Sequence, residues 1–157
     1  MRIKVVRRLS LEEIRRQLKT HESRRGMPFS EFERRFIERK IDPGLFGEYV
    51  EWASLVHAYE AYEEGGELDY AVEEAREIKT DELERMVTFK RLELLRTIST
   101  SHVESINDVA RKVGRNVKNV YNDLKALEKM GFLHFRKVGR RNLIPESLIE
   151  EVSVIIQ

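Results

Sequence analysis

Residues 117–129 combine helical spacing with side chains that can bind nucleic acid. The apolar residues of this segment fall on one helical face: Val117, Val120, Leu124 and Leu127. The other faces carry long amines, amides and an aromatic ring: Lys118, Asn119, Tyr121, Asn122 and Lys125. Such groups bind base edges and phosphates in duplex DNA. We therefore interpret this helix as a candidate for DNA contact.

A basic hairpin is predicted after this helix. Residues 132–135 predict one strand, Gly139 predicts the turn, and residues 143–144 begin a return strand that Pro145 ends. Polar side chains, most of them cations, gather around the turn: Arg136, Lys137, Arg140, Arg141 and Asn142. Because Lys and Arg neutralise phosphates, we expect the arginines and lysine of this hairpin to anchor a phosphate backbone, together with Arg115.

Local signals predict how the candidate helix is positioned. Ser105 can cap a helix over residues 106–113, and Gly114 suits the turn that follows because glycine adopts positive φ at little steric cost. Asn116 can cap the next helix, and we also include it among the candidate DNA contacts. The pattern therefore predicts a helix-turn-helix followed by a β-hairpin.

A supporting helix is expected upstream of this pair. Residues 89–98 have helical periodicity, and Leu92, Leu95 and Ile98 are spaced to cover the other two helices. A further helix is expected to begin at Thr80 and to run without a break into this one. We therefore place a domain boundary near residue 80.

The C-terminal half resembles the winged helix-turn-helix DNA-binding regulators of the ArsR/MarR-like archaeal type. The resemblance lies in RLELLRTI, in INDVARKVGRNVKNVYNDLKALEKMGFL and in the basic hairpin, and it covers about residues 85–157. It implies that the recognition helix faces DNA with Lys118, Tyr121, Asn122 and Lys125. It implies that the wing carries Arg136, Lys137, Arg140 and Arg141. Metal-sensing branches place Cys or His clusters near these helices; this chain has no Cys, so metal sensing is not implied.

Two other interpretations of this half stay open. Winged helices also serve as protein-docking domains, and a basic amphipathic helix pair is often only a solvated structural module. The charge pattern favours DNA contact, whereas the fold alone does not determine function.

Charges are segregated along the chain, although the net charge is only +1. Residues 1–41 hold 13 Lys and Arg against 6 Asp and Glu, residues 42–87 hold 3 against 14, and residues 88–157 hold 13 against 8. The basic C-terminal block suits a phosphate backbone. The acidic middle block must face away from DNA, toward either a basic protein or the chain's own basic N-terminus.

Composition and motifs argue against several functional classes. The absence of Cys excludes disulfides and Cys-ligated zinc, and the four His residues are scattered without metal-ligand spacing. No segment matches a glycine-rich phosphate loop. We therefore expect no enzyme activity, cofactor or metal. No apolar run approaches the ~20 residues of a membrane span, and the N-terminus lacks the features of a secretory signal, so we expect a cytoplasmic protein.

The N-terminal half is predicted to be mostly helical. Capping boxes at Ser10 with Glu13 and at Ser30 with Glu33 predict two helices, and a third is expected over about residues 45–62. The third helix has two apolar stripes, whereas a surface helix needs one. The chain's own helices, a second subunit or another protein can cover the second stripe. We consider one set as a candidate partner-binding face: Trp52, Leu55, Tyr59 and Tyr62.

Strands are expected only at the ends of the chain and in the wing. Residues 3–6 and 151–156 can pair with each other, within one chain or between subunits, whereas residues 67–79 are expected to form a short acidic helix or a linker. The expected fold is mainly α with a small β-wing. Residues 1–80 would form a helical dimerisation or partner-binding region, and residues 81–157 a winged helix-turn-helix.

The N-terminal half resembles, more loosely, the helical segments that precede DNA-binding parts in some prokaryotic antitoxins. LEEIRRQLKTHESRRGMPFSEFERRFIER and EYVEWASLVHAYEAY carry this resemblance, which implies a toxin partner. The sequence thus predicts a sequence-specific transcriptional regulator that binds double-stranded DNA as a homodimer. The alternative is an antitoxin or adaptor whose N-terminal helices bind a partner protein.

Overall fold

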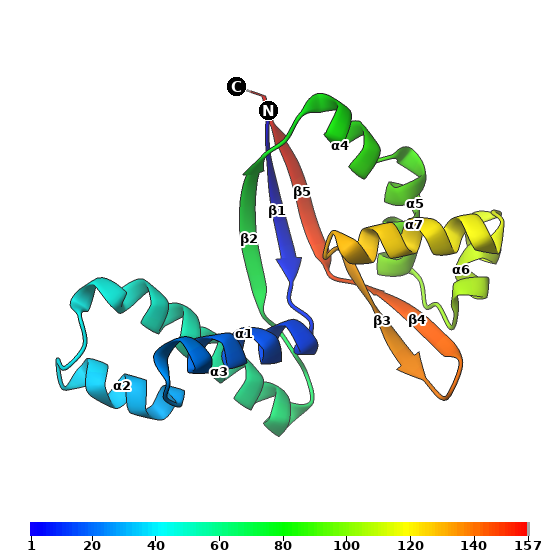
Figure 1. The fold of residues 1–157 in the computed structure, drawn as a ribbon. Helices are drawn as coiled ribbons and strands as arrows, with labels where there is room; N and C mark the ends of the chain where they lie inside the picture. The colour runs from blue at the N-terminus through cyan, green and yellow to red at the C-terminus, as the bar shows by residue number, and fades with distance from the viewer. Residues whose placement is uncertain (157) are drawn as a thin grey trace. The chain divides into compact units, whose positions relative to one another are not determined.

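The computed structural model describes residues 1–156, which form helices and small antiparallel sheets and are mainly helical (Figure 1). The helices are α1 (Leu11–Arg25), α2 (Phe29–Ile37), the 3-10 turn η1 (Pro43–Leu45), α3 (Phe46–Gly65), α4 (Thr80–Met86), α5 (Phe89–Thr100), α6 (Ile106–Val113) and α7 (Val117–Lys129). The strands are β1 (Arg2–Arg8), β2 (Ala71–Glu77), β3 (Leu133–Val138), β4 (Asn142–Ser147) and β5 (Ile149–Ile155).

The chain forms two compact units. Leu9–Tyr70 is a helical unit, and Met1–Arg8 with Ala71–Gln157 is a mixed unit. The helical unit is therefore an insertion between β1 and β2. This division differs from the boundary expected near residue 80, because β1 and β2 belong to the same sheet as the C-terminal strand.

The sheet of the mixed unit has the order β2-β1-β5, with antiparallel neighbours. Val5 of β1 lies opposite Val152 of β5, so the predicted pairing between the two ends of the chain is confirmed, and it occurs within one chain. The prediction of a helix or linker over residues 67–79 was wrong, because β2 occupies most of that segment.

Ion pairs link the acidic edge strand β2 to the basic strand β1. Arg2 pairs with Glu77 at 3.3 Å, and Arg7 pairs with Glu74 at 3.0 Å. Part of the acidic middle block therefore faces the chain's own basic N-terminus, which was one of the two expected alternatives.

The core of the mixed unit joins this sheet to the helices. Its buried side chains come from β1, from the residue after β2, from α5 to α7 and their connections, and from β3: Ile3, Val5, Ile78, Leu94, Leu95, Ile98, Val103, Val109, Ala110, Val120, Leu124, Leu127, Phe132 and Leu133. Leu92 was expected in this core but is 45% exposed. Leu94, Leu95 and Ile98 define the inner face of α5, and Leu92 lies outside it.

The predicted continuous helix from Thr80 was also wrong, because the chain breaks between α4 and α5. Thr88 has extended backbone angles, and its Oγ1 accepts a hydrogen bond from the backbone N–H of Arg91 at 3.2 Å. A side-chain cap of this kind starts a new helix, so α5 begins at Phe89.

The two predicted capping boxes of the helical unit had different outcomes. The first is confirmed: the Glu13 N–H donates to Ser10 Oγ at 3.2 Å, and the Ser10 N–H donates to the Glu13 carboxylate at 3.1 Å. The second was wrong, because α2 begins one residue before Ser30, after Pro28. The Glu33 carboxylate instead accepts a hydrogen bond from the hydroxyl of Tyr49 on α3 at 2.8 Å.

An aromatic core holds the helical unit together. Trp52 and Leu55 are 1% and 0% exposed, so they cannot form part of the partner-binding face that we expected. Trp52 packs against Phe32 with ring centroids 5.1 Å apart. Tyr59 and Tyr62 are partly buried. The chain's own helices therefore cover this stripe of α3, and the exposed apolar residues lie on the other one.

Candidate nucleic-acid interface

Local hydrogen bonds set the geometry of α6 and α7. Ser105 Oγ accepts from the Asp108 N–H at 3.0 Å, and Asn116 Oδ1 accepts from the Lys118 N–H at 2.9 Å. Gly114, between the two helices, has a φ of +65°. Both predicted caps and the predicted glycine turn are therefore confirmed.

Helix α7 has a buried face and a polar exposed face. Val120, Leu124 and Leu127 are at most 1% exposed, whereas Val117, which we had placed with them, is 43% exposed. Lys118, Asn119 and Asn122 are exposed, and within residues 1–156 their side chains form no hydrogen bond or ion pair. Tyr121 is 40% exposed. These donors are therefore available to a ligand.

Lys125 differs from the other polar residues of α7 because it has partners. Its Nζ lies 2.7 Å from the Glu128 carboxylate and 5.4 Å from the ring centroid of Phe135 on β3. The hydrogen bond to Glu128 raises the pKa of Lys125. Lys125 therefore packs toward the hairpin and has less freedom to bind a ligand than Lys118.

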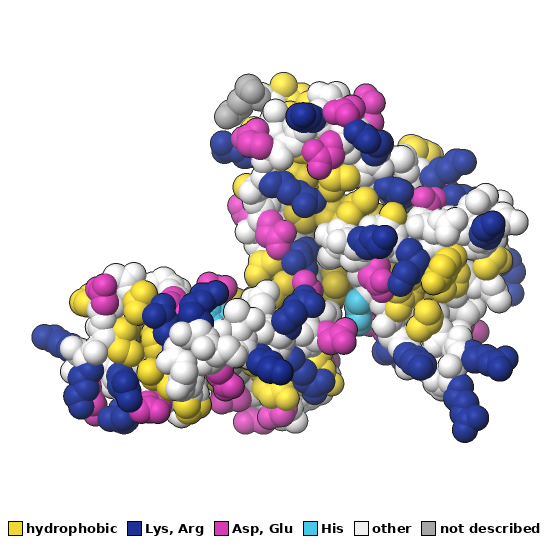
Figure 2. Space-filling view, viewed as in Figure 1, with side chains coloured by type: hydrophobic (Ala, Val, Ile, Leu, Met, Phe, Trp, Pro, Cys, Tyr) yellow, Lys and Arg dark blue, Asp and Glu magenta, His cyan; other side chains and the backbone are white. Residues whose placement is uncertain are grey.

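The β3–β4 hairpin ends in a basic turn (Figure 2). Lys137, Arg140 and Arg141 are exposed, and within the described residues they have no acidic partner, whereas Arg136 pairs with Glu146 of β4. Gly139 has a φ of +66°, as the turn requires. Pro145 does not end the hairpin but lies within β4, opposite Phe135.

The hairpin is tied to the start of α6. Asn142 Nδ2 donates to the backbone carbonyl of Glu104 at 3.0 Å. This bond links β4 to the loop before α6. The tip of the hairpin thus has a defined position beside the helix pair.

A groove of about 600 Å³ lies where α6, α7 and the hairpin meet. Its lining contains Ser105, Ile106, Asn107, Val117, Lys118, Tyr121, Arg141, Asn142 and Leu143. Cations from α7 and from the hairpin turn therefore border one hollow that also exposes apolar surface. Such a lining can hold a phosphate backbone and contact base methyl groups.

The structure corrects the expectation for Arg115. Its side chain is only 17% exposed, and its Nη2 lies 2.7 Å from Asp123 Oδ2. The other Asp123 oxygen lies 3.2 Å from Nε of Arg91, which also donates through Nη1 to the carbonyl of Arg85 at 2.6 Å. Arg115 therefore holds the turn and is not free to anchor phosphate. Sequence reasoning missed Asp123 and Arg91; the signal was an acid beside the buried Leu124, in the first two turns of a helix that carry no other acid.

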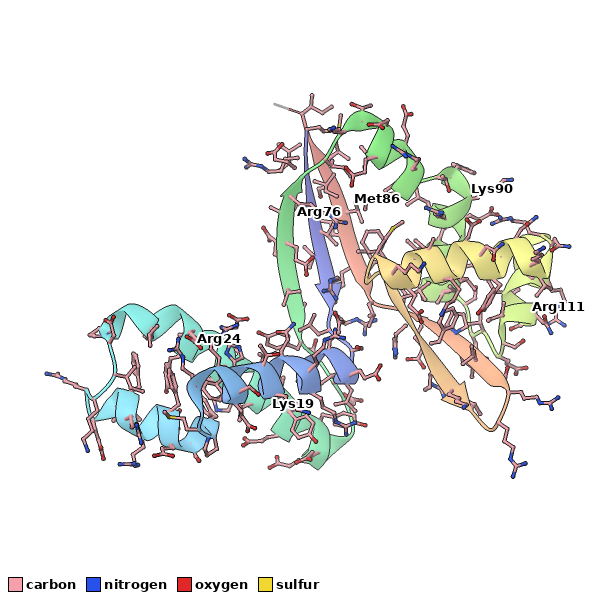
Figure 3. The ribbon with its side chains drawn as sticks, viewed as in Figure 1. Lys19, Arg24, Arg76, Met86, Lys90 and Arg111 are labelled. Atoms are coloured by element: carbon pink, nitrogen blue, oxygen red, sulfur yellow. The ribbon has the colours of Figure 1, made fainter. Side chains whose placement is uncertain are left out.

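Asp108 is a second residue that sequence reasoning left without a partner. It is 7% exposed and accepts a hydrogen bond from the Glu104 N–H at 3.0 Å. This bond, and then the cations Arg111 and Lys112, lower the pKa of Asp108. Figure 3 labels Arg111 on α6. These contacts stabilise the start of α6.

Within residues 1–156, no group of three or more His, Asp or Glu side chains is arranged to hold a metal ion. None of the helices described there is long and apolar enough to cross a membrane.

One family model, described as HVO_A0114, matches residues 86–154. The matched segment contains α5, α6, α7 and the β3–β4 hairpin, and it does not include the helical unit. No curated protein and no solved structure matches the chain.

Proposed function

We propose that this protein is a sequence-specific transcriptional regulator that binds double-stranded DNA through a winged helix-turn-helix. In this proposal α7 is the recognition helix that enters the major groove, and the β3–β4 hairpin is the wing. The supporting helix is α5. The protein acts by binding, and the proposal assigns it no catalytic step.

One observation supports this function above all others. Lys118 of α7 and Arg141 of the hairpin turn line one groove, and neither side chain has an acidic partner within residues 1–156. Most other cations of the mixed unit have acidic partners, as Arg2, Arg91 and Arg111 do. Unpaired cations on one surface are the electrostatic footprint of phosphate binding.

The exposed side chains divide into two roles. Asn119 and Asn122 carry amides, which recognise adenine by paired hydrogen bonds, and Tyr121 offers apolar contact to thymine methyl groups. Lys137, Arg140 and Arg141 anchor phosphates without reading sequence. Arg136 is available for DNA only if it leaves Glu146. Asn116 contributes mainly as the cap of α7.

The proposed regulator is a homodimer that reads a palindromic operator. Two recognition helices in one dimer would contact half-sites ~34–36 Å apart, which is one turn of the duplex. Two wings would then flank the same site. The acidic β2 strand, which pairs with β1, stays outside the proposed contact surface.

The structure gives no support to the alternative function as an antitoxin or adaptor. That proposal assigned partner binding to Trp52, Leu55, Tyr59 and Tyr62. Because the first two are buried within the helical unit, a partner could reach only Tyr59 and Tyr62 of this set without unfolding part of the unit.

Selection of bound sequences from random duplexes tests the proposed function. We expect enrichment of a two-fold symmetric motif, and binding to that motif should weaken steeply as salt rises. A gel-shift titration at two salt concentrations measures this dependence. Recovery of no motif, together with no salt-dependent binding to any duplex, would contradict the proposal.

A further inference from the structure

We propose that the exposed face of α3 is a homodimer interface, and that α3 of a second copy of this chain occupies it in antiparallel orientation. The inference identifies the partner surface for the dimer of the proposed function, and it rests on that function only for the expectation of a dimer. The contacts that carry it lie entirely within the helical unit.

A seam of six residues runs along α3 at alternating intervals of four and three residues. It consists of Phe46, Val50, His57, Glu60 and Glu64, which are exposed, and of Ala53, which is half-buried. This spacing keeps the six side chains on one line along α3, and the apolar ones are the first three. Phe46 and Val50 are 58% and 43% exposed. The seam therefore begins with apolar surface that the rest of the helical unit leaves partly exposed.

The opposite side of α3 is already occupied. Trp52 and Leu55 are buried, and the rings of His21 on α1 and Phe32 on α2 pack against Trp52. A surface helix normally buries one apolar stripe and exposes polar residues opposite it. Because α3 has apolar residues on both sides, a second copy would complete its burial.

A groove of about 540 Å³ lies beside the apolar end of this seam. Its lining contains Phe36, Ile37, Arg39, Ile41, Pro43 and Tyr49. Ile37 is 68% exposed, and Phe36 stacks on Tyr49 with ring centroids 4.7 Å apart. Figure 2 shows hydrophobic side chains at the surface between α2 and the first turns of α3. The groove extends the apolar surface that a second helix would cover.

Charge identifies the occupant of this surface. Glu60, Glu63 and Glu64, at the far end of α3, have no ion pair among the described residues. Arg39 lines the groove and also has no acidic partner in residues 1–156. Its backbone has a left-handed φ of 59°, which is uncommon for a residue other than glycine. An antiparallel second α3 would bring its acidic end to Arg39.

The same pairing would form twice, because a two-fold interface applies each contact in both directions. Helix α3 has 20 residues and is about 30 Å long. In two antiparallel copies of equal length, the first turns of each helix lie beside the last turns of the other. One chain thus supplies both the basic apolar end and the acidic end. This self-complementarity favours a second copy over an unrelated protein.

Sedimentation of the full chain over a range of concentrations tests the proposal. We expect the parent protein to dimerise, and Val50→Glu to weaken dimerisation at least about tenfold because it places a charge in the apolar seam. The matched control is Val154→Glu on β5, where the valine is 45% exposed and lies outside the helical unit. Circular dichroism verifies that each variant remains folded.

A charge-exchange pair makes the test specific for antiparallel packing. Arg39→Glu and Glu64→Arg should each weaken the dimer, and the double variant should recover much of the lost affinity. Additive losses in the double variant, a monomeric parent at all concentrations, or equal effects of the Val50 and Val154 variants would each overturn the proposal. Because no DNA is present, these outcomes are independent of the proposed DNA binding.

Discussion

Asp123 Oδ2 lies 2.7 Å from Nη2 of Arg115, which joins the middle of α7 to the turn that precedes it. The two side chains are 21% and 17% exposed. The other oxygen of Asp123 binds Arg91 on α5. One carboxylate therefore connects two cations from different elements and orients α7 against the supporting helix.

Replacing Asp123 by Ala should reduce stability. The change leaves two largely buried guanidinium groups without their shared carboxylate, and hydrogen bonds to charged groups contribute roughly 1.5–3 kcal/mol. We expect a lower free energy of unfolding in urea by about this amount. DNA affinity should also fall, because α7 loses a contact that positions it.

The matched control is Glu93→Ala on α5, since Glu93 is exposed and has no ion pair among the described residues. If both variants unfold at the same urea concentration as the parent, the Asp123 cluster does not stabilise the fold. If the Asp123 variant is destabilised but retains full DNA affinity, Asp123 stabilises the fold without positioning α7 for DNA binding.

Local signals in the sequence predicted the parts of the site that depend on near neighbours. The caps at Ser105 and Asn116 and the left-handed turn at Gly114 involve residues two to four positions apart, so the chain specifies them directly. The same holds for the capping box at Ser10. These predictions are confirmed because few distant residues compete with them.

Features that depend on distant residues were not predictable in the same way. β2 reads AVEEARE, which lacks the alternation of a half-buried strand, and it pairs along β1, where basic residues such as Arg7 meet acidic ones such as Glu74. Likewise, α3 has two apolar stripes, and only the positions of α1 and α2 determine that Trp52 is buried while Phe46 is exposed.

The role of Arg115 shows the same limit within the candidate interface. A basic residue in the turn before a recognition helix is a reasonable phosphate contact, and sequence spacing gives no sign of its burial. Its acceptor, Asp123, is eight residues away on the other side of the cap. The burial of Arg115 can be predicted only when its pairing with Asp123 in three dimensions is known.

Stability should depend on Asp108 in the acidic pH range. Contacts in the folded state lower the pKa of Asp108 below its ordinary value of 3.8, so the carboxylate stabilises the fold above that value, and the stabilisation is lost as pH falls through the lowered pKa. Asp108→Asn should therefore be less stable than the parent at neutral pH. The difference should shrink at acidic pH.

Urea unfolding of both proteins between about pH 2.5 and 7 measures this effect. The exposed Asp69→Asn variant serves as the control, because Asp69 has no ion pair among the described residues. A constant difference between the Asp108 variant and the parent over the whole pH range would show that ionisation of Asp108 does not contribute to stability.

The double variant Arg140→Ala with Arg141→Ala should weaken binding to every duplex. These arginines are exposed at the hairpin turn and have no acidic partner in residues 1–156, so they are free to neutralise phosphates. Each lost phosphate contact lowers the slope of log affinity against log salt by about 0.9. We expect a total change of roughly 1.8, measured by titration at several salt concentrations.

The control for the hairpin turn removes two exposed cations elsewhere in the mixed unit. Arg76→Ala with Lys79→Ala changes the net charge equally, and both residues lie at or just after β2. Equal salt slopes in the two double variants would reject the hairpin turn as a specific phosphate contact and would leave only a general effect of charge.

Asn122→Ala should impair recognition of sequence more than binding itself. Asn122 is exposed on α7, and its amide has no partner among residues 1–156, so both its donor and its acceptor are available to a base. A paired hydrogen bond from an amide to adenine contributes ~1–3 kcal/mol of discrimination. We expect affinity for the selected operator to fall by this amount, while affinity for random duplex stays nearly unchanged.

Competition assays with single base-pair variants of the operator locate the position that Asn122 reads, because the Asn122→Ala protein should be indifferent to the base at that position alone. Equal losses on operator and random DNA would instead assign Asn122 to the phosphate backbone.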